Sequence, residues 1–260
     1  MKKNPAIVLA TLFLSFSICC KTTKQAKTAT DETIAVLSYN VRNCLGLDNK
    51  VDYQRVANVI SKTHADIVAL QELDSVTSRS KGVSVLNELA RLTGMTPTYN
   101  ASISYQGGKY GIGILTREKP LKTEARALPG KEEARSVLMV EMKDYSLACS
   151  HFSLTETDRL KSVDIVNQLT ATSTKPVLLA GDLNATPAST AIQSFAKNWQ
   201  FLTDTTQLTI PANKPTECID YIMARKSARY SFTVLRTVVE NEPVASDHLP
   251  VWATIKIEKK

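Results

Sequence analysis

Residues 176–187 read PVLLAGDLNATP, and this stretch decides the fold class that the sequence predicts. Its four apolar residues, Val177–Ala180, are long enough for one buried strand, and Gly181 is expected to end that strand. Asp182 and Asn184 would then lie at a sheet edge, where a carboxylate and a carboxamide can hold a cation, a water molecule and a phosphoryl oxygen together. Gly, Asp and Asn are also the usual turn residues, so the stretch alone fits an ordinary strand end as well.

The same order, an apolar strand followed by a polar side chain, recurs along the chain. It is found in IAVLSYN, DIVALQE, LACSH and VLLAGDLN, and the reverse order is found in CIDYIMA and SDHLPVWATI. Strands that run in opposite directions bring the end of one beside the start of another. We therefore expect one shared site at one sheet edge, formed by Asn40, Glu72, His151, Asp182, Asn184, Asp220, Asp247 and His248.

The hydrophobic pattern predicts a single α/β domain from residue 33 to residue 260. Strands are expected at residues 34–38, 67–70, 111–115, 137–142, 146–150, 177–180, 219–224, 231–236 and 251–257. Helices are expected to begin after Asp52 and Ser84, the second ending at Gly94, and to span residues 156–172 and 190–196. Because these strands are more than one layer of helices can cover, we expect two packed sheets with helices outside them.

Residues 1–20 are predicted to be an export signal. Their apolar run, Ala6–Ile18, has 13 residues and is too short to span a bilayer. The signal resembles that of a bacterial lipoprotein, in which Cys20 would become the lipidated N-terminus, although Cys19 stands where a small residue is usual. Plain secretion is the alternative. Residues 21–32 would form a flexible tether, and we expect a monomeric cell-envelope protein that its lipid holds at a membrane.

The distribution of charge gives no support for nucleic acid as a partner. The 260-residue chain has a formal net charge of +7, but five of its 32 lysines and arginines lie in residues 1–30, which hold no acidic residue. Residues 31–260 therefore carry 27 basic and 25 acidic residues, without a basic run. A polyanion-binding domain usually concentrates basic residues on one surface.

Three cysteines follow the signal, namely Cys44, Cys149 and Cys218. None lies in a C-x-x-C pair, so a zinc site is not predicted. An exported protein can form one disulfide among the three, and the sequence does not choose the pair.

The gathered side chains offer hard oxygen ligands, which favour magnesium or manganese over zinc. Glu72 is the best single ligand, with Asn40 beside it. Asp182 can orient or deprotonate an attacking water molecule, and Asn184 can donate to charge that develops on a phosphoryl group.

His151 and His248 are two of only three histidines in the chain. The third, His64, follows a predicted helix and is expected to be structural. An Asp that accepts from one imidazole nitrogen fixes the ring and favours the cationic form, which suits an anionic phosphate. A nucleophilic Ser-His-Asp triad is not predicted, because the chain has no G-x-S-x-G motif.

The stretches LSYNVRN, VALQELD, YGIGILTR, EARSVLMVE, SHFSL, AGDLNATP, CIDYIMA and SDHLPVWATI run in order from residue 37 to residue 257. This series resembles the endonuclease/exonuclease/phosphatase superfamily, which includes deoxyribonuclease-I-like enzymes, apurinic endonucleases, inositol polyphosphate 5-phosphatases and sphingomyelinases. The resemblance implies a four-layer α/β/β/α sandwich and the hydrolysis of a phosphate ester with the help of a divalent metal ion.

The resemblance also implies a role for each acidic residue near the metal. Glu72 would bind the essential ion, Mg²⁺ with Mn²⁺ as an alternative, helped by Asn40 and Asp247. Asp182 would position the attacking water.

The remaining implied roles concern the phosphoryl group. Asn184 would contact it, and His151 and His248 would stabilise the transition state, with Asp220 paired to His248. Arg135 falls where relatives often place an arginine near the site, so we expect it to contact the substrate; a surface charge is the other interpretation.

The sequence leaves the substrate open. A small phosphodiester or phosphomonoester is preferred, because the chain is short for the superfamily and has no basic run. An extracytoplasmic nuclease that acts on DNA or RNA is the main alternative. A membrane-lipid phosphodiesterase, which residues 209–215 (TIPANKP) would support as an exposed apolar loop, and a binding module without catalysis are further alternatives.

Overall fold

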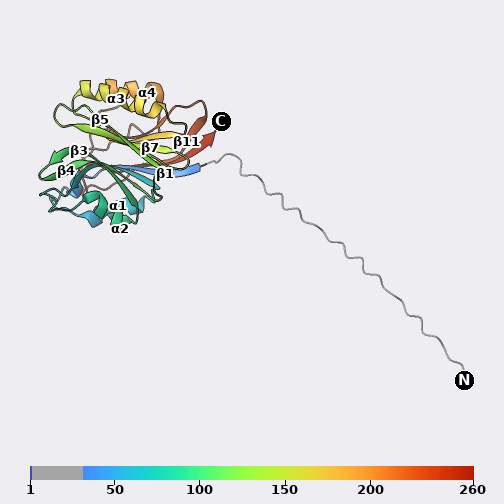
Figure 1. Cartoon of the computed structure of the whole chain (residues 1–260), viewed down its shortest axis with the longest axis horizontal. Helices are drawn as coiled ribbons and strands as arrows, with labels where there is room; N and C mark the ends of the chain where they lie inside the picture. Colours follow the sequence, from blue (N-terminus) through green and yellow to red (C-terminus); the bar gives the residue numbers. More distant parts are fainter. Residues whose placement is uncertain (2–31) are drawn as a thin grey trace. The chain divides into compact units, whose positions relative to one another are not determined.

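The computed structural model describes Met1 and residues 32–260, and the latter form two six-stranded sheets with helices on their outer faces (Figure 1). The layers follow one another as helix, sheet, sheet, helix. The four-layer α/β/β/α sandwich expected from the sequence is therefore confirmed. The predicted signal, the tether and Cys20 lie outside the described residues. Within residues 32–260, no helix is long and apolar enough to cross a membrane.

The first sheet has the strand order β11–β12–β1–β2–β4–β3. Its strands are β1 (Glu32–Asn40), β2 (Ile67–Ser75), β3 (Thr96–Tyr105), β4 (Gly108–Thr116), β11 (Tyr230–Val239) and β12 (Val251–Lys259). β1 and β2 are parallel, and the other neighbours are antiparallel. The ends of β1 and β2 therefore lie beside the start of β12.

The second sheet has the order β5–β6–β7–β8–β10–β9. Its strands are β5 (Lys122–Leu128), β6 (Arg135–Glu141), β7 (Ser146–His151), β8 (Val177–Asp182), β9 (Trp199–Phe201) and β10 (Asp220–Arg225). β7 and β8 are its parallel pair, and β10 runs antiparallel to β8. The ends of β7 and β8 therefore lie beside the start of β10.

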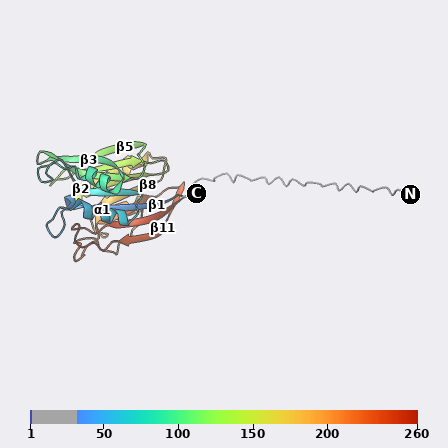
Figure 2. The same ribbon diagram turned by 90° about the horizontal axis from the view of Figure 1, so that it is seen from below.

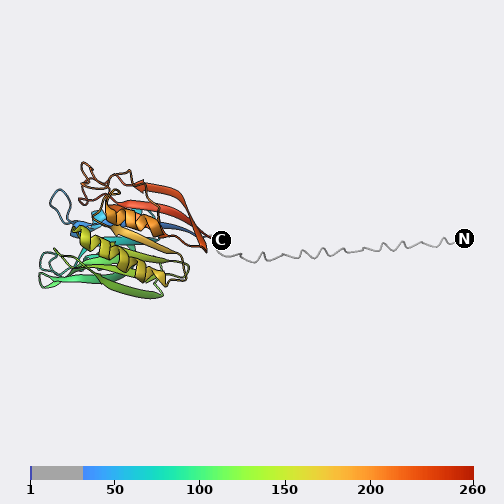
Figure 3. The same cartoon turned by 90° about the horizontal axis from the view of Figure 1, so that it is seen from above.

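Two helices cover each sheet. α1 (Tyr53–Lys62) and α2 (Val85–Thr93) pack on the first sheet, and Figure 2 shows α1 over β1 and β2. α3 (Glu156–Ala171) and α4 (Thr190–Asn198) lie side by side over the second sheet (Figure 3). As the sequence predicts, the Asp52 carboxylate caps α1 by accepting from the Arg55 amide, and α2 ends at Gly94, whose φ of 69° suits glycine.

Three apolar clusters separate the layers. The inner cluster lies between the sheets and includes Ile114, Ile222 and Ile255. The outer clusters lie under α1 and α2 and under α3 and α4. Each of the three cysteines in residues 32–260 belongs to a different cluster: Cys149 to the inner one, Cys44 to the one under α1 and α2, and Cys218 to the one under α3 and α4. All three are free, so the disulfide that the sequence left open is not formed.

Three strands are absent from the sequence-based assignment, namely β3, β5 and β9. All three lie at sheet edges. β3 contains no buried residue, and β5 buries only Leu128. An edge strand that buries little carries no apolar alternation, and Pro97 within β3 is tolerated only at an edge.

The expectation that Gly181 ends its strand is wrong, because β8 continues through Asp182. Gly181 pairs with Tyr221, and a Cβ atom built on it would lie 2.1 Å from the Ser150 carbonyl oxygen of β7. The residue is glycine because two strand backbones approach closely there, and not because the chain turns.

Candidate active site

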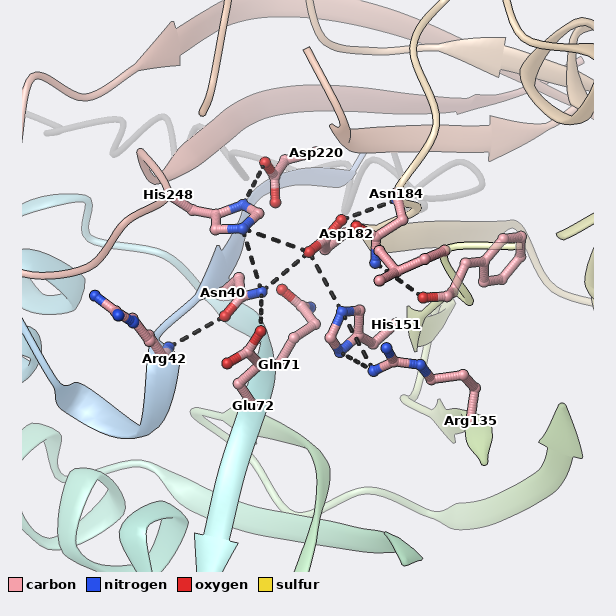
Figure 4. A network of polar contacts seen from close by, with 12 residues as sticks. Asn40, Arg42, Gln71, Glu72, Arg135, His151, Asp182, Asn184, Asp220 and His248 are labelled. Atoms are coloured by element: carbon pink, nitrogen blue, oxygen red, sulfur yellow. Dashed lines mark hydrogen bonds and ion pairs between the residues drawn. The ribbon is translucent and has the colours of Figure 1, made fainter. Parts of the chain in front are cut away.

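The residues predicted for one site gather at the same end of the two sheets, and Figure 4 shows all of them except Asp247. Strand ends and strand starts supply most of them: Asn40 ends β1, His151 ends β7, Asp182 ends β8, Asp220 begins β10, and Asp247 and His248 precede β12. The expectation that the second strand ends at Glu72 is wrong, because β2 continues to Ser75 and Glu72 lies at a bulge within it. The first sheet and the second each contribute part of the set. The site therefore depends on how the two sheets pack.

A β-bulge orients the side chains of Gln71 and Glu72. The register of β2 against β4 shifts between Leu70 and Leu73, so that two residues of β2 oppose one residue of β4. Glu72 takes a left-handed conformation with φ of 60°. Consecutive strand residues normally point to opposite faces, but here both side chains reach the site (Figure 4).

The carboxamide of Asn40 joins the two sheets. Its Nδ2 donates to Oε1 of Glu72 and to Oδ2 of Asp182, each at 3.0 Å. Its Oδ1 accepts from the backbone N–H of Arg42 at 3.1 Å. The Nδ2 group of Asn40 thus donates to two carboxylates, one from each sheet. A metal-ligand role would need its oxygen to face them instead, and that role stays a prediction.

Asp220 and His248 form the pair that the resemblance implies. The distance from Nδ1 of His248 to Oδ2 of Asp220 is 2.9 Å, and both residues are buried. Burial by itself would lower the pKa of His248, but the carboxylates of Asp220, Asp182 and Asp247 together raise it to about 10. His248 is therefore a cation at neutral pH, and its Nε2 faces Oδ2 of Asp182 at 3.6 Å.

His151, unlike His248, is neutral at neutral pH. Burial lowers its pKa to about 3, and the charges of Arg135 and His248 act in the same direction, against Asp182. Nη1 of Arg135 lies 3.0 Å from Nδ1 of His151. Because a guanidinium only donates, Nδ1 is the acceptor, and the proton of the neutral ring is on Nε2. That nitrogen lies 3.4 Å from Oδ2 of Asp182.

Arg135 is buried, with 8% of its side chain exposed, and its Nη1 also donates to Glu133 at 2.8 Å. The interpretation as a surface charge is therefore wrong. Asn184, in a left-handed conformation, donates its Nδ2 to the Phe152 carbonyl, while its backbone N–H donates to Oδ1 of Asp182. Its predicted contact with a phosphoryl group stays a prediction.

The donor set fits a hard divalent cation beside Glu72. Burial raises the pKa of Glu72, and the carboxylates of Asp182 and Asp247 raise it further, against the hydrogen bond from Asn40. Within residues 32–260 no group donates a hydrogen bond to its Oε2. Asp247 is one-third exposed, with Oδ2 3.4 Å from Nε of Arg42. A cation would relieve the repulsion among these carboxylates.

A second group of ligand atoms, from Asp182, Asp220 and His248, lies within 4.8 Å. Nδ1 of His248 is already hydrogen-bonded to Asp220. These three residues therefore form a hydrogen-bonded pair beside Asp182, and we do not assign them as a metal site. The sequence-based choice of Glu72 and Asp247 as ligands is not tested by these distances.

Sequence reasoning missed the part that Thr209 plays. Its hydroxyl donates to Oδ2 of Asp220 at 2.6 Å, the same oxygen that His248 contacts. In the same loop, the Ala212 N–H donates to the Asp247 carbonyl. Thr209 and Ala212 therefore anchor this loop beside the site, while Pro211, Asn213 and Lys214 between and after them are exposed. The membrane-lipid phosphodiesterase alternative stays a prediction. No signal in the sequence marks Thr209, because the loop has no periodic pattern.

His64 lies apart from this site, as expected. It is exposed in the turn between α1 and β2, at the end of β2 opposite Glu72.

Residues 37–248 match the Endonuclease/Exonuclease/phosphatase family, so the chain belongs to this family. Members of the family are hydrolases that act on phosphate esters and depend on divalent metals. No curated protein sequence matches the chain.

Solved structures show the same fold. A family protein from Bacteroides thetaiotaomicron is 18% identical, with a TM-score of 0.72 over 88% of this chain and 96% of the other. A mannosyl-6-phosphatase of the same organism is 18% identical, with a TM-score of 0.69 over 85% and 99%. The human Nocturnin catalytic domain with a bound sulfate anion is 17% identical, with a TM-score of 0.65 over 88% and 97%.

Proposed function

We propose that this protein hydrolyses a phosphodiester or phosphomonoester by attack of water, with a divalent cation as cofactor. One observation carries the proposal. A single amide, that of Asn40, holds Glu72 and Asp182 together, and a cationic His248 and a neutral His151 flank the Asp182 carboxylate. The site then contains a general base, Asp182, and a carboxylate that can bind a cation, Glu72. It also contains two imidazoles, His151 and His248, that can contact the phosphate.

Glu72 and Asp247 would hold the cation, with Asn40 beside them. When bound, Mg²⁺ or Mn²⁺ neutralises phosphate charge and polarises the phosphoryl oxygen. A protein-bound Mg²⁺ ion usually keeps several of its water ligands, so one or two carboxylates are enough to hold it.

Asp182 acts on the attacking water. The Nδ2 group of Asn40 and the N–H of Asn184 orient its carboxylate, which receives a proton as the water oxygen bonds to phosphorus. The ester P–O bond breaks, and the leaving oxygen takes up a proton through solvent while Asp182 releases the one it received. The products are an alcohol and a phosphomonoester from a diester, or an alcohol and inorganic phosphate from a monoester. His248 stabilises the developing oxyanion with its positive charge, which Asp220 maintains, and His151 offers its Nε2–H to the same group.

A small phosphate ester is the preferred substrate. The near balance of charge in residues 31–260 gives little attraction for a polyanion. Purified protein with Mg²⁺ should therefore hydrolyse bis-nitrophenyl phosphate or nitrophenyl phosphate faster than it nicks plasmid DNA. Faster nicking at equal enzyme concentration would favour the nuclease alternative.

Replacing Glu72 by Gln or His248 by Ala should lower kcat by roughly 10²–10⁴-fold, because each change removes charge that acts in the transition state. The unfolding midpoint of Glu72→Gln in urea should change little, whereas that of His248→Ala should fall, because the buried Asp220 carboxylate loses its partner; kcat is therefore measured where both variants are folded. Glu118→Gln, on an exposed turn, is the matched control. Wild-type turnover in both site variants would refute the assignment.

We also propose, from the sequence alone, that Cys20 is lipidated and that the protein lies in the cell envelope. Mass spectrometry of the protein from membranes should find a lipid on Cys20, and Cys20→Ala should move the protein to the soluble fraction. A wild-type protein that is soluble and unmodified would refute this.

A further inference from the structure

Three buried polar atoms of site residues have no hydrogen-bond partner: Oε1 of Gln71, Oδ1 of Asp220 and Nε of Arg135. Asp220 and Arg135 are each held by other strong contacts, with His248 and with Glu133, whereas Gln71 is not. Gln71 is fully buried, and its Nε2 donates to Sγ of Cys149 at 3.4 Å, while its Oε1 accepts no hydrogen bond. Sulfur is a weak acceptor, so neither end of this amide is well satisfied. A buried acceptor without a donor costs free energy, so such an atom in a binding site indicates a donor that arrives with a ligand.

The position of Gln71 relates this atom to the catalytic centre. The β-bulge brings Gln71 to the same side as Glu72, and Figure 4 shows its side chain between Asn40 and Glu72 on one side and His151 on the other. Tyr39, the neighbour of Asn40 in β1, also has an unpartnered buried oxygen, but its ring lies in the outer cluster under α1. Of these two oxygens, only Oε1 of Gln71 lies among the residues of the site.

We propose that Gln71 is a positioning residue for the divalent cation: its Oε1 accepts a hydrogen bond from a water molecule bound to the cation that Glu72 holds. The inference rests on the proposed function. Mg²⁺ retains several of its waters in protein sites, and these waters are strong donors. A neutral amide can accept from such a water without competing for the cation. Outer partners of this kind typically change metal affinity by about 10–100-fold.

The test measures cation binding directly. Mn²⁺ affinity is determined from the electron paramagnetic resonance signal of free Mn²⁺, and thermal unfolding is followed with and without Mg²⁺. Gln71→Met keeps the length of the side chain and removes the acceptor. We expect this variant to unfold at a higher temperature than the wild type without metal, to bind Mn²⁺ about 10–100-fold more weakly, and to gain less from Mg²⁺.

Two variants serve as comparisons. Gln71→Glu keeps an acceptor at the same position and should bind Mn²⁺ at least as tightly as the wild type, which keeps the proposal testable even if Gln71→Met does not fold. Tyr39→Phe removes an unpartnered oxygen that lies in the outer cluster and should leave Mn²⁺ affinity and the Mg²⁺ response unchanged.

The outcomes separate this inference from the proposed function. If Glu72→Gln loses Mn²⁺ while Gln71→Met binds it as the wild type does, the inference fails and the function stands; a higher KM in that variant would then assign the oxygen to the substrate. Tenfold weaker binding by Gln71→Glu would also overturn it. A wild type that binds neither ion overturns both.

Discussion

At the scale of single residues, the two histidines show how partners divide one side-chain type into two roles. His248 faces a carboxylate through each ring nitrogen and is charged. His151 receives a guanidinium at Nδ1 and is neutral. One ring therefore supplies a positive charge, and the other supplies an oriented N–H donor. The sequence predicts both histidines, but not this difference, because it depends on contacts between distant strands.

Arg135→Met should raise the pKa of His151, because the guanidinium is one of the charges that lower it. The imidazole signals of the variant, followed by NMR as pH falls, should move at a higher pH than those of the wild type. Arg126→Met, an exposed residue of β5, is the control and should have no effect. An unchanged His151 titration in Arg135→Met would contradict the role given to this arginine.

At the scale of secondary-structure elements, the central strands and the edge strand β11 were predictable, whereas the other three edge strands, β3, β5 and β9, were not. Runs such as Val177–Ala180 read as strands because both of their faces are buried. β3 and β5 lie at edges and carry polar residues. The β-bulge at Gln71 and Glu72 was not predictable either, because IVALQELDS contains no glycine that would mark it. The convergence of polar side chains was predictable, because it follows from where the strands end.

Gly181→Ala should destabilise the protein by at least about 2 kcal/mol, because the new methyl group would overlap a carbonyl oxygen of β7. Activity should fall further than stability requires, since His151 pairs with Asp182 in the register that this contact fixes. Urea unfolding and kcat are the two measurements. Gly82→Asn, at an open position with φ of 76°, should change stability by no more than about 0.5 kcal/mol.

Glu132 ties the segment before β6 to the start of α3. Its carboxylate accepts from the Leu154 N–H at 2.7 Å and from the Ser153 hydroxyl at 2.9 Å. Burial would raise its pKa, but these hydrogen bonds and Arg135 lower it from 4.5 to about 2. Because the folded-state pKa is below the unfolded one, this contribution to stability is complete above about pH 4.5 and is lost as pH falls to about 2.

Glu132→Gln should therefore lower the free energy of unfolding by roughly 0.5–1.5 kcal/mol at pH 7. The difference from the wild type should shrink as pH falls from 4.5 to 2. Urea unfolding at several pH values tests this, and a difference that is constant with pH would contradict it.

At the scale of the whole molecule, the site is a property of the contact between two sheets. Asn40 and Glu72 come from the first sheet, whereas His151, Asp182 and Asp220 come from the second. The inner apolar cluster sets the separation of these groups. Sequence patterns predicted that two sheets would pack, but the distances across the site depend on how individual side chains interdigitate.

Ile114→Ala in the inner cluster and Leu89→Ala in the outer cluster should each cost about 2–5 kcal/mol of stability. Only Ile114→Ala should also lower kcat, by about 10-fold or more, because a small shift of one sheet misplaces catalytic groups. Urea unfolding and kcat at a temperature where both variants are folded provide the comparison. Equal kcat values would show that the inner cluster does not control the site.

The chain completes the first sheet last, because β12 inserts between β11 and β1 after the second sheet has been laid down. His248 is presented just before that strand. A growing polypeptide on the ribosome therefore contains Glu72 and Asp182 well before His248, whose positive charge faces the Asp182 carboxylate, has been added. The proposed hydrolysis therefore cannot begin during synthesis before residue 248 has been joined and β12 has paired with β1.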